Sequence, residues 1–302
     1  MTAAIRRIWQ TALFEWRTAV RSRRALVLLL IYLSTAVLCM YGTISVLGRM
    51  EGELASVLQL PTDAETGVVS ETLWKSKTFK RIVRSAVGDS LVFEDISKRH
   101  PMELAYAWVA FLFAPMLVVF VAGGRVAGDL HSGAARYALM RVTRFEWSLG
   151  KYVGQALMIA LALAASALGA WVVVCCRLPV RAAAALCVPM FAWGVKAWIY
   201  SLAWLGVALG LSHLSRSSAK AVSLGFLVLF VFSLWPTLLN ALVEWAGLPA
   251  AIRNLDALVP SSAENALWRS APAALVSGAA HLLLLGLAYL MAGAAAFARR
   301  DA

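Results

Sequence analysis

The sequence predicts an all-α integral membrane protein, with six transmembrane helices and an N-terminal interfacial amphipathic helix. Hydrophobic residues make up 61% of the 302 residues and charged residues only 15%, whereas soluble domains average about 45–50% apolar and about 25% charged residues. The mean hydropathy is +0.75 and the chain contains twelve tryptophans, a residue that is enriched at membrane interfaces. These observations exclude a soluble globular protein.

Six segments are long and apolar enough to cross the hydrocarbon core, which requires about 20 residues of helix. They form one domain over residues 1–302, and Pro115 and Pro236 should kink the second and fifth spans. The predicted spans are 25–47, 103–124, 152–174, 186–212, 221–243 and 273–297.

Residues 1–24 precede the first span and have helical periodicity. Apolar residues recur on one face, and Arg6, Arg7, Gln10, Glu15 and Arg17 lie elsewhere around the helix. An amphipathic helix with tryptophan and a basic polar face lies in the headgroup plane. The alternative is an ordinary juxtamembrane helix that serves only as an anchor, and both interpretations place the segment at the inner surface.

The distribution of basic residues predicts that both termini are cytoplasmic. With the N-terminus inside, the inner segments carry fifteen Lys and Arg residues and the short outer loops carry four. The long outer loop 48–102 contains eight basic and eight acidic residues, so its charges cancel. Cytoplasmic loops are enriched in Lys and Arg, and because the net charge of +12 is concentrated beside apolar runs, it does not indicate nucleic-acid binding.

Two connections between spans show capping signals. Asp129 to Met140 reads as a short helix, and Thr143 with Glu146 forms a capping-box signature for the start of the third helix. The outer segment 244–272 is apolar, so we expect short helices that lie on or dip into the outer interface. Ser261 and Glu264 predict a second capping box there.

The sequence offers little evidence of enzymatic chemistry. Gly150-Lys151 is not part of a P-loop, because Phe145 occupies the position of its first glycine. A lipid-modifying membrane enzyme would need clustered acidic or histidine residues, and a secondary transporter is expected to show inverted repeats; neither is evident. We therefore expect no catalytic residue, metal or cofactor in this chain.

Lys196 is the clearest charged residue inside a predicted span, and intramembrane charges are candidates for function. It could line a polar pathway or pair with Glu103 at the start of the second span. Alternatively, its long side chain extends to the outer headgroups.

Three short runs, in the order in which they occur, carry a family resemblance. They are Asp129-Leu130-His131-Ser132-Gly133, Val142-Thr143-Arg144 and Leu149-Gly150-Lys151. Together with six spans and the ending Phe297-Ala298-Arg299-Arg300-Asp301, they resemble the signature of ABC type-2 permeases, the membrane subunits of exporter-like ABC transporters. Arg141 stands where that family often has proline.

This resemblance implies that residues 125–151, hereafter the coupling segment, contain a cytoplasmic coupling helix that docks on a separate ABC ATPase. The polar contacts would be Arg136, Arg141, Thr143, Arg144 and Glu146. ATP and Mg²⁺ would be bound by that partner, and the permease would form a homodimer or pair with a second permease. We expect the protein in the bacterial cytoplasmic (inner) membrane, moving an unidentified substrate.

Overall fold

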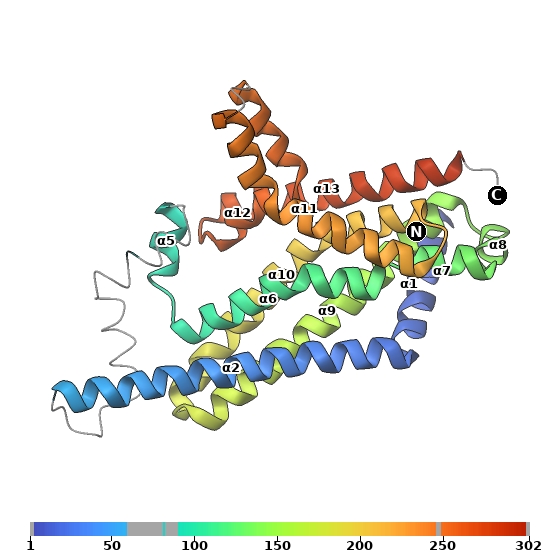
Figure 1. Ribbon diagram of the computed structural model, residues 1–302. Coiled ribbons are helices and arrows are strands. Elements are labelled where there is room, and N and C mark those ends of the chain that lie inside the picture. Colours follow the sequence, from blue (N-terminus) through green and yellow to red (C-terminus); the bar gives the residue numbers. More distant parts are fainter. Residues whose placement is uncertain (1–2, 59–80, 82–89, 246–248, 300–302) are drawn as a thin grey trace.

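The computed structural model describes residues 3–58, 81, 90–245 and 249–299, and within these ranges the chain contains helices and no strands (Figure 1). Six helices are long and apolar enough to cross a membrane, which confirms the predicted number of spans. They are α2 (Arg23–Leu58), α6 (Pro101–Ala122), α9 (Arg144–Arg177), α10 (Val180–Leu214), α11 (Ser218–Trp245) and α13 (Pro272–Ala298).

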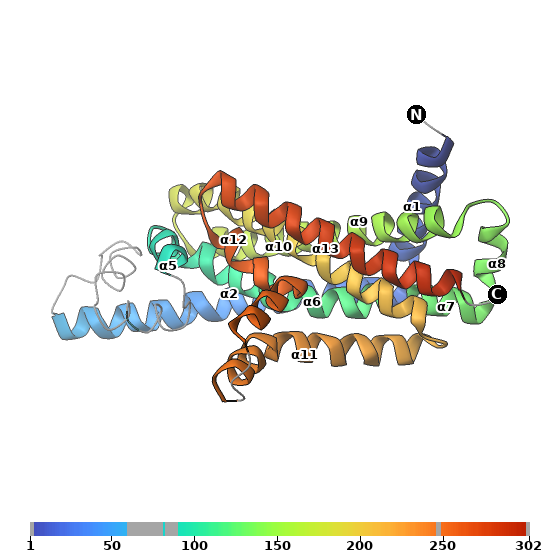
Figure 2. The ribbon, with the colours of Figure 1, turned by 90° about the horizontal axis from the view of Figure 1, so that it is seen from above.

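The N-terminal segment forms α1 (Ala3–Arg21), as its periodicity predicts. The helix is interrupted at Ser22, and α1 is steeply inclined to α2 (Figures 1 and 2). Ala12, Glu15 and Ala19 are buried because α1 packs against the start of α9. A glutamate that sequence periodicity placed on the polar face therefore lies inside the protein.

Helix α10 lies at the centre of the bundle and packs against α6, α9 and α13. Its crossing with α13 depends on glycine, since a Cβ added to Gly206 would lie 1.9 Å from the carbonyl oxygen of Gly286. Small residues allow helix backbones to approach closely in membranes, where packing replaces the hydrophobic effect between helices. In Figure 2, α9 and α11 lie on opposite sides of the bundle.

The fifth span, α11, contains Pro236, and Figure 1 shows its second half bending away from the bundle. Three short helices then lead to α13: η1 (Ala250–Leu258), η2 (Pro260–Ala263) and α12 (Glu264–Trp268). This agrees with the expectation of short helices in 244–272. The connection between α12 and α13 also contacts α5 (Ser90–Ile96): Asp95 accepts a hydrogen bond from the backbone amide of Ser270, at 2.8 Å.

The predicted capping box at Ser261 and Glu264 is wrong. Ser261 lies inside the 3₁₀ helix η2, which is preceded by Val259, so Ser261 does not occupy an N-cap. Its hydroxyl has no hydrogen-bond partner among the described residues. Glu264 instead accepts a hydrogen bond from Trp268 Nε1 at 3.3 Å.

The coupling segment also differs from its prediction. Asp129 to Met140 is not one helix, because the chain forms α7 (Arg125–Ser132) and α8 (Ala134–Leu139), separated by Gly133. Gly133 has a φ of 77°, a conformation that glycine adopts without steric cost, so it ends α7. Both helices lie at the end of the bundle that carries the two termini (Figure 1).

Most of the outer loop 48–102 falls outside the described residues. This includes the helix with an apolar face that Trp74, Phe79, Ile82, Val83 and Val87 predict. The described parts of the loop are the end of α2, Arg81, α5, and the residues from Ser97 that lead into α6.

Candidate functional site at the junction of α1, α7 and α9

Helix α9 begins with the predicted capping box. The Glu146 amide donates to Thr143 Oγ1 at 3.2 Å, and the Thr143 amide donates to Glu146 Oε2 at 2.9 Å. These bonds satisfy backbone groups that a helix start leaves unpaired. They fix the direction in which the chain leaves α8 and enters the span α9.

Glu146 is buried and also binds Arg7 of α1, whose guanidinium lies 2.6 Å from the carboxylate. The hydrogen bond and charge of Glu146 raise the pKa of Arg7. Such a paired, bidentate arrangement is stronger than a single surface contact. The structure therefore places Glu146 in an internal contact between α1 and α9, and its contact with a partner stays a prediction.

Arg144 is also occupied within the chain. Its guanidinium donates to the carbonyl oxygens of Phe297 and Ala298, at 3.3 and 2.9 Å, and lies 5.1 Å from the Phe297 ring centroid. It thus ties the end of α13 to the start of α9. Of the five residues predicted to contact a partner, Thr143, Arg144 and Glu146 mainly organise this junction.

Two glycines let α1 approach α9. A Cβ on Gly150 would lie 2.5 Å from Thr11 Cβ, and one on Gly154 would lie 2.8 Å from the carbonyl oxygen of Ala12. The spacing of four residues puts both glycines on one face of α9, as in small-residue contacts between membrane helices. Lys151 follows the first glycine directly, so its side chain begins beside α1.

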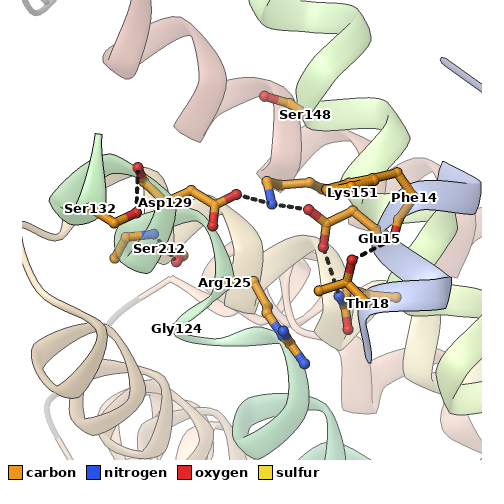
Figure 3. Close-up of polar contacts among 12 residues, drawn as sticks. Phe14, Glu15, Thr18, Gly124, Arg125, Asp129, Ser132, Ser148, Lys151 and Ser212 are labelled. Atoms are coloured by element: carbon orange, nitrogen blue, oxygen red, sulfur yellow. Dashed lines mark hydrogen bonds and ion pairs between the residues drawn. The ribbon is translucent and has the colours of Figure 1, made fainter. Parts of the chain in front are cut away.

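Lys151 is the centre of a buried ionic cluster (Figure 3). Its side chain is 1% exposed, and its ammonium group contacts Glu15 of α1 and lies 2.6 Å from Asp129 of α7. Gln155 also donates to Glu15 at 3.4 Å. One lysine therefore joins the interfacial helix, the coupling segment and a membrane span; Glu15, Asp129 and Lys151 are called the Lys151 cluster below.

Sequence reasoning did not identify the Lys151 cluster. Asp129 and Lys151 stood in the motif runs, but nothing in their spacing showed that they meet, and Glu15 is remote in sequence. Two signals were available in the sequence. Glu15 is the acidic residue of a first helix whose other charged residues are basic, and Lys151 directly follows a glycine.

Helix α7 is held to α10 as well. Ser212 Oγ accepts a hydrogen bond from the Ala127 amide at 3.0 Å. His213 is buried; its Nδ1 lies 2.7 Å from the Leu209 carbonyl oxygen, and its Nε2 lies 2.8 Å from Ser148 Oγ. Since a carbonyl only accepts, Nδ1 carries the proton and Nε2 accepts from Ser148.

The outward face of α8, together with the turn after it, takes no part in the ion pairs and hydrogen bonds of the junction. Arg136 and Arg141 are exposed, and Tyr137 and Met140 are 75% and 80% exposed. Exposed aromatic and methionine side chains beside arginine are the residue types enriched in protein interfaces. The predicted contact residues Arg136 and Arg141 therefore lie on a surface that a partner can reach.

Lys196 and Glu103 lie away from this junction and do not pair with each other. Glu103 is buried, accepts a hydrogen bond from Trp193 Nε1 at 3.1 Å, and lies 3.5 Å from Arg99. The Lys196 ammonium lies over the Trp193 ring, 4.2 Å from its centroid. Trp193 thus contacts both residues, and a pathway role for them stays a prediction.

Comparison with known proteins agrees with this architecture. The family model described as ABC-2 family transporter protein matches residues 9–302, which includes α7, α9 and most of α1. None of the curated proteins compared with the chain matches it. The chain is a multi-pass membrane protein that belongs to the ABC-2 transporter family, the permease component of ABC transporters.

Proposed function

We propose that this permease is driven by a separate ABC ATPase, which docks on the coupling segment from the cytoplasm of a bacterial cell. Two features observed together carry the proposal: α8 has an exposed face, and the neighbouring helix α7 is held to the membrane helices by ionic contacts. Tyr137 and Met140 face outward, while the Lys151 cluster fastens α7 to α1 and α9. Family membership supports an ATPase partner.

The attachment allows a push on α8 to move membrane helices together. Helix α7 follows α6 after two residues, and α8 leads through the Thr143 cap into α9. Packed helices with ionic and hydrogen-bonded contacts move as units between discrete arrangements. An ATPase that displaces α8 would thereby tilt α6 and α9, while Arg7 and Glu15 carry the same displacement to α1.

Charge supports the cytoplasmic placement of this end. The termini, α7 and α8 share it (Figure 1), and the segments predicted to be inside contain fifteen basic residues against four in the short outer loops. Such an excess retains loops in the cytoplasm. The proposed location is the inner membrane of a bacterium.

The proposed unit contains two permease chains, either two copies or one copy with a second permease. Helix α11 supports this, because it borders the bundle and is the least buried of the six spans. A second six-helix subunit on this side would enclose a pathway between the two chains.

Co-purification tests the docking proposal. Arg136→Glu with Arg141→Glu reverses two exposed charges that make no ion pair among the described residues. We expect the permease to lose its P-loop partner, while Arg216→Glu, an exposed reversal at the same end, retains it. Undiminished recovery of the ATPase with the double variant would refute docking at α8, as would substrate transport in cells that lack the ATPase.

A further inference from the structure

A cavity of about 190 Å³ opens between the turn joining α1 to α2, helix α7 and the start of α11. None of the residues on the exposed face of α8 lines it. Its polar lining comes from Ser22, Arg24, Arg125 and Ser218. No ionic partner within the described residues accounts for either arginine.

The guanidinium of Arg125 is available to a ligand. Its Nε donates to the Val121 carbonyl oxygen at 3.2 Å, which leaves the terminal amino groups without an acceptor among the described residues. Figure 3 shows Arg125 extending away from the chain of contacts made by Asp129, Lys151 and Glu15. Asp129 also borders the cavity, but its carboxylate is bound to Lys151.

The balance of charge around the cavity is positive. The Lys151 cluster carries one net negative charge, since two carboxylates surround one ammonium group. Against it stand Arg24 and Arg125, together with exposed Arg21 and Arg23 on the same turn. An anion entering the cavity would therefore meet more positive than negative charge.

The cavity is amphiphilic rather than polar throughout. Leu28 of α2 and Phe120 of α6 line it on the membrane side, and Phe120 is 43% exposed. Its volume is below the roughly 300–1,000 Å³ of pockets that enclose drug-sized ligands, so it suits a small charged group attached to an apolar chain that continues along the helices.

We propose that this cavity binds the phosphate headgroup of an anionic phospholipid. Arginine forms paired hydrogen bonds to phosphate oxygens, and basic pockets between membrane helices recognise acidic headgroups. Arg24 and Arg125 hold the phosphate, and the acyl chains follow Leu28 and Phe120 into the bilayer. Because Arg125 begins α7, the bound lipid contacts the base of the coupling segment; this inference does not depend on the partner ATPase.

Native mass spectrometry tests the proposal by measuring how tightly dioctanoyl phosphatidylglycerol binds to the detergent-purified chain. A basic residue near an anionic lipid surface contributes about 1 kcal/mol, or about fivefold in affinity. Arg24→Gln with Arg125→Gln should therefore bind about 25-fold more weakly, whereas Arg216→Gln should bind as the wild type does. Phosphatidylcholine of the same chain length should bind at least tenfold more weakly than phosphatidylglycerol.

A second variant blocks the cavity without removing charge. Gly128 lines it, and a Cβ added there would meet no heavy atom within 4 Å, so Gly128→Leu should fold normally and lose saturable binding. Wild-type affinity in Gly128→Leu or in the double arginine variant overturns the proposal. Inorganic phosphate that binds as tightly as the lipid overturns the assignment to a lipid headgroup.

Discussion

Replacing Lys151 by methionine should destabilise the protein by removing the only cation among the three charges of the Lys151 cluster. The side chains of Lys151 and Glu15 are 1% and 9% exposed, so the variant leaves Glu15 as a buried carboxylate without its ammonium partner. Gln155 remains within 3.4 Å of Glu15, but one amide cannot replace a positive charge.

The size of the loss follows from burial. Removing one partner of a buried ion pair costs about 3–5 kcal/mol, whereas replacing both by apolar residues of similar volume is often neutral. Asp129 adds little, because its side chain is 37% exposed and solvent screens its charge. At roughly 2–4 °C per kcal/mol, Lys151→Met should lower the melting temperature by roughly 6–20 °C.

Thermal unfolding of the detergent-purified protein provides the assay, and Glu15→Met with Lys151→Met provides the matched control. We expect the double variant to regain most of the lost melting temperature, because it removes the unpaired carboxylate along with the lysine. A single variant as stable as wild type, or a double variant no more stable than the single one, would show that the cluster does not hold α1 to α9.

Three further predictions concern other contacts and are tested by thermal unfolding and proteolysis. Arg7→Gln should lower the melting temperature more than Glu146→Gln, because it leaves the buried Glu146 carboxylate without its cation, whereas a glutamine at position 146 can still complete the α9 cap; equal effects would contradict this. Gly206→Ala should cost about 1–3 kcal/mol, the usual cost of overpacking, while Gly42→Ala, with nothing within 4 Å, should be neutral or stabilising. Arg144→Gln should expose the end of α13 to carboxypeptidase, and an unchanged digestion rate would refute that contact.

The sequence predicted those features of the fold that depend on local pattern. Six apolar runs marked the six spans, and the periodicity of residues 1–24 marked α1, because length and hydropathy are local properties. The Thr143 cap was predicted because both partners lie three residues apart. The same reasoning failed at Ser261, where the backbone adopts a 3₁₀ turn and places the serine inside a helix.

The junction could not be predicted because its contacts join distant residues. Glu15 and Lys151 are separated by 136 positions, and Arg144 reaches Phe297 across 153. A pattern along one helix shows which face is polar, but not which other helix covers it. The packing shows Arg144 and Glu146 in internal contacts that the sequence did not indicate, and their contact with a partner stays a prediction.

The most direct test of the central claim is cross-linking from α8 in intact cells. Met140→Cys carries a thiol at an exposed position just before α9. Val180→Cys provides the control: it is also exposed, but it lies at the start of α10, beyond the other end of α9. With a bifunctional maleimide reagent, the account predicts an adduct between Met140→Cys and the ABC ATPase, and none from Val180→Cys. It would be contradicted if Met140→Cys reacted with a membrane-impermeant maleimide added outside the cell, or if the ATPase cross-linked only to Val180→Cys.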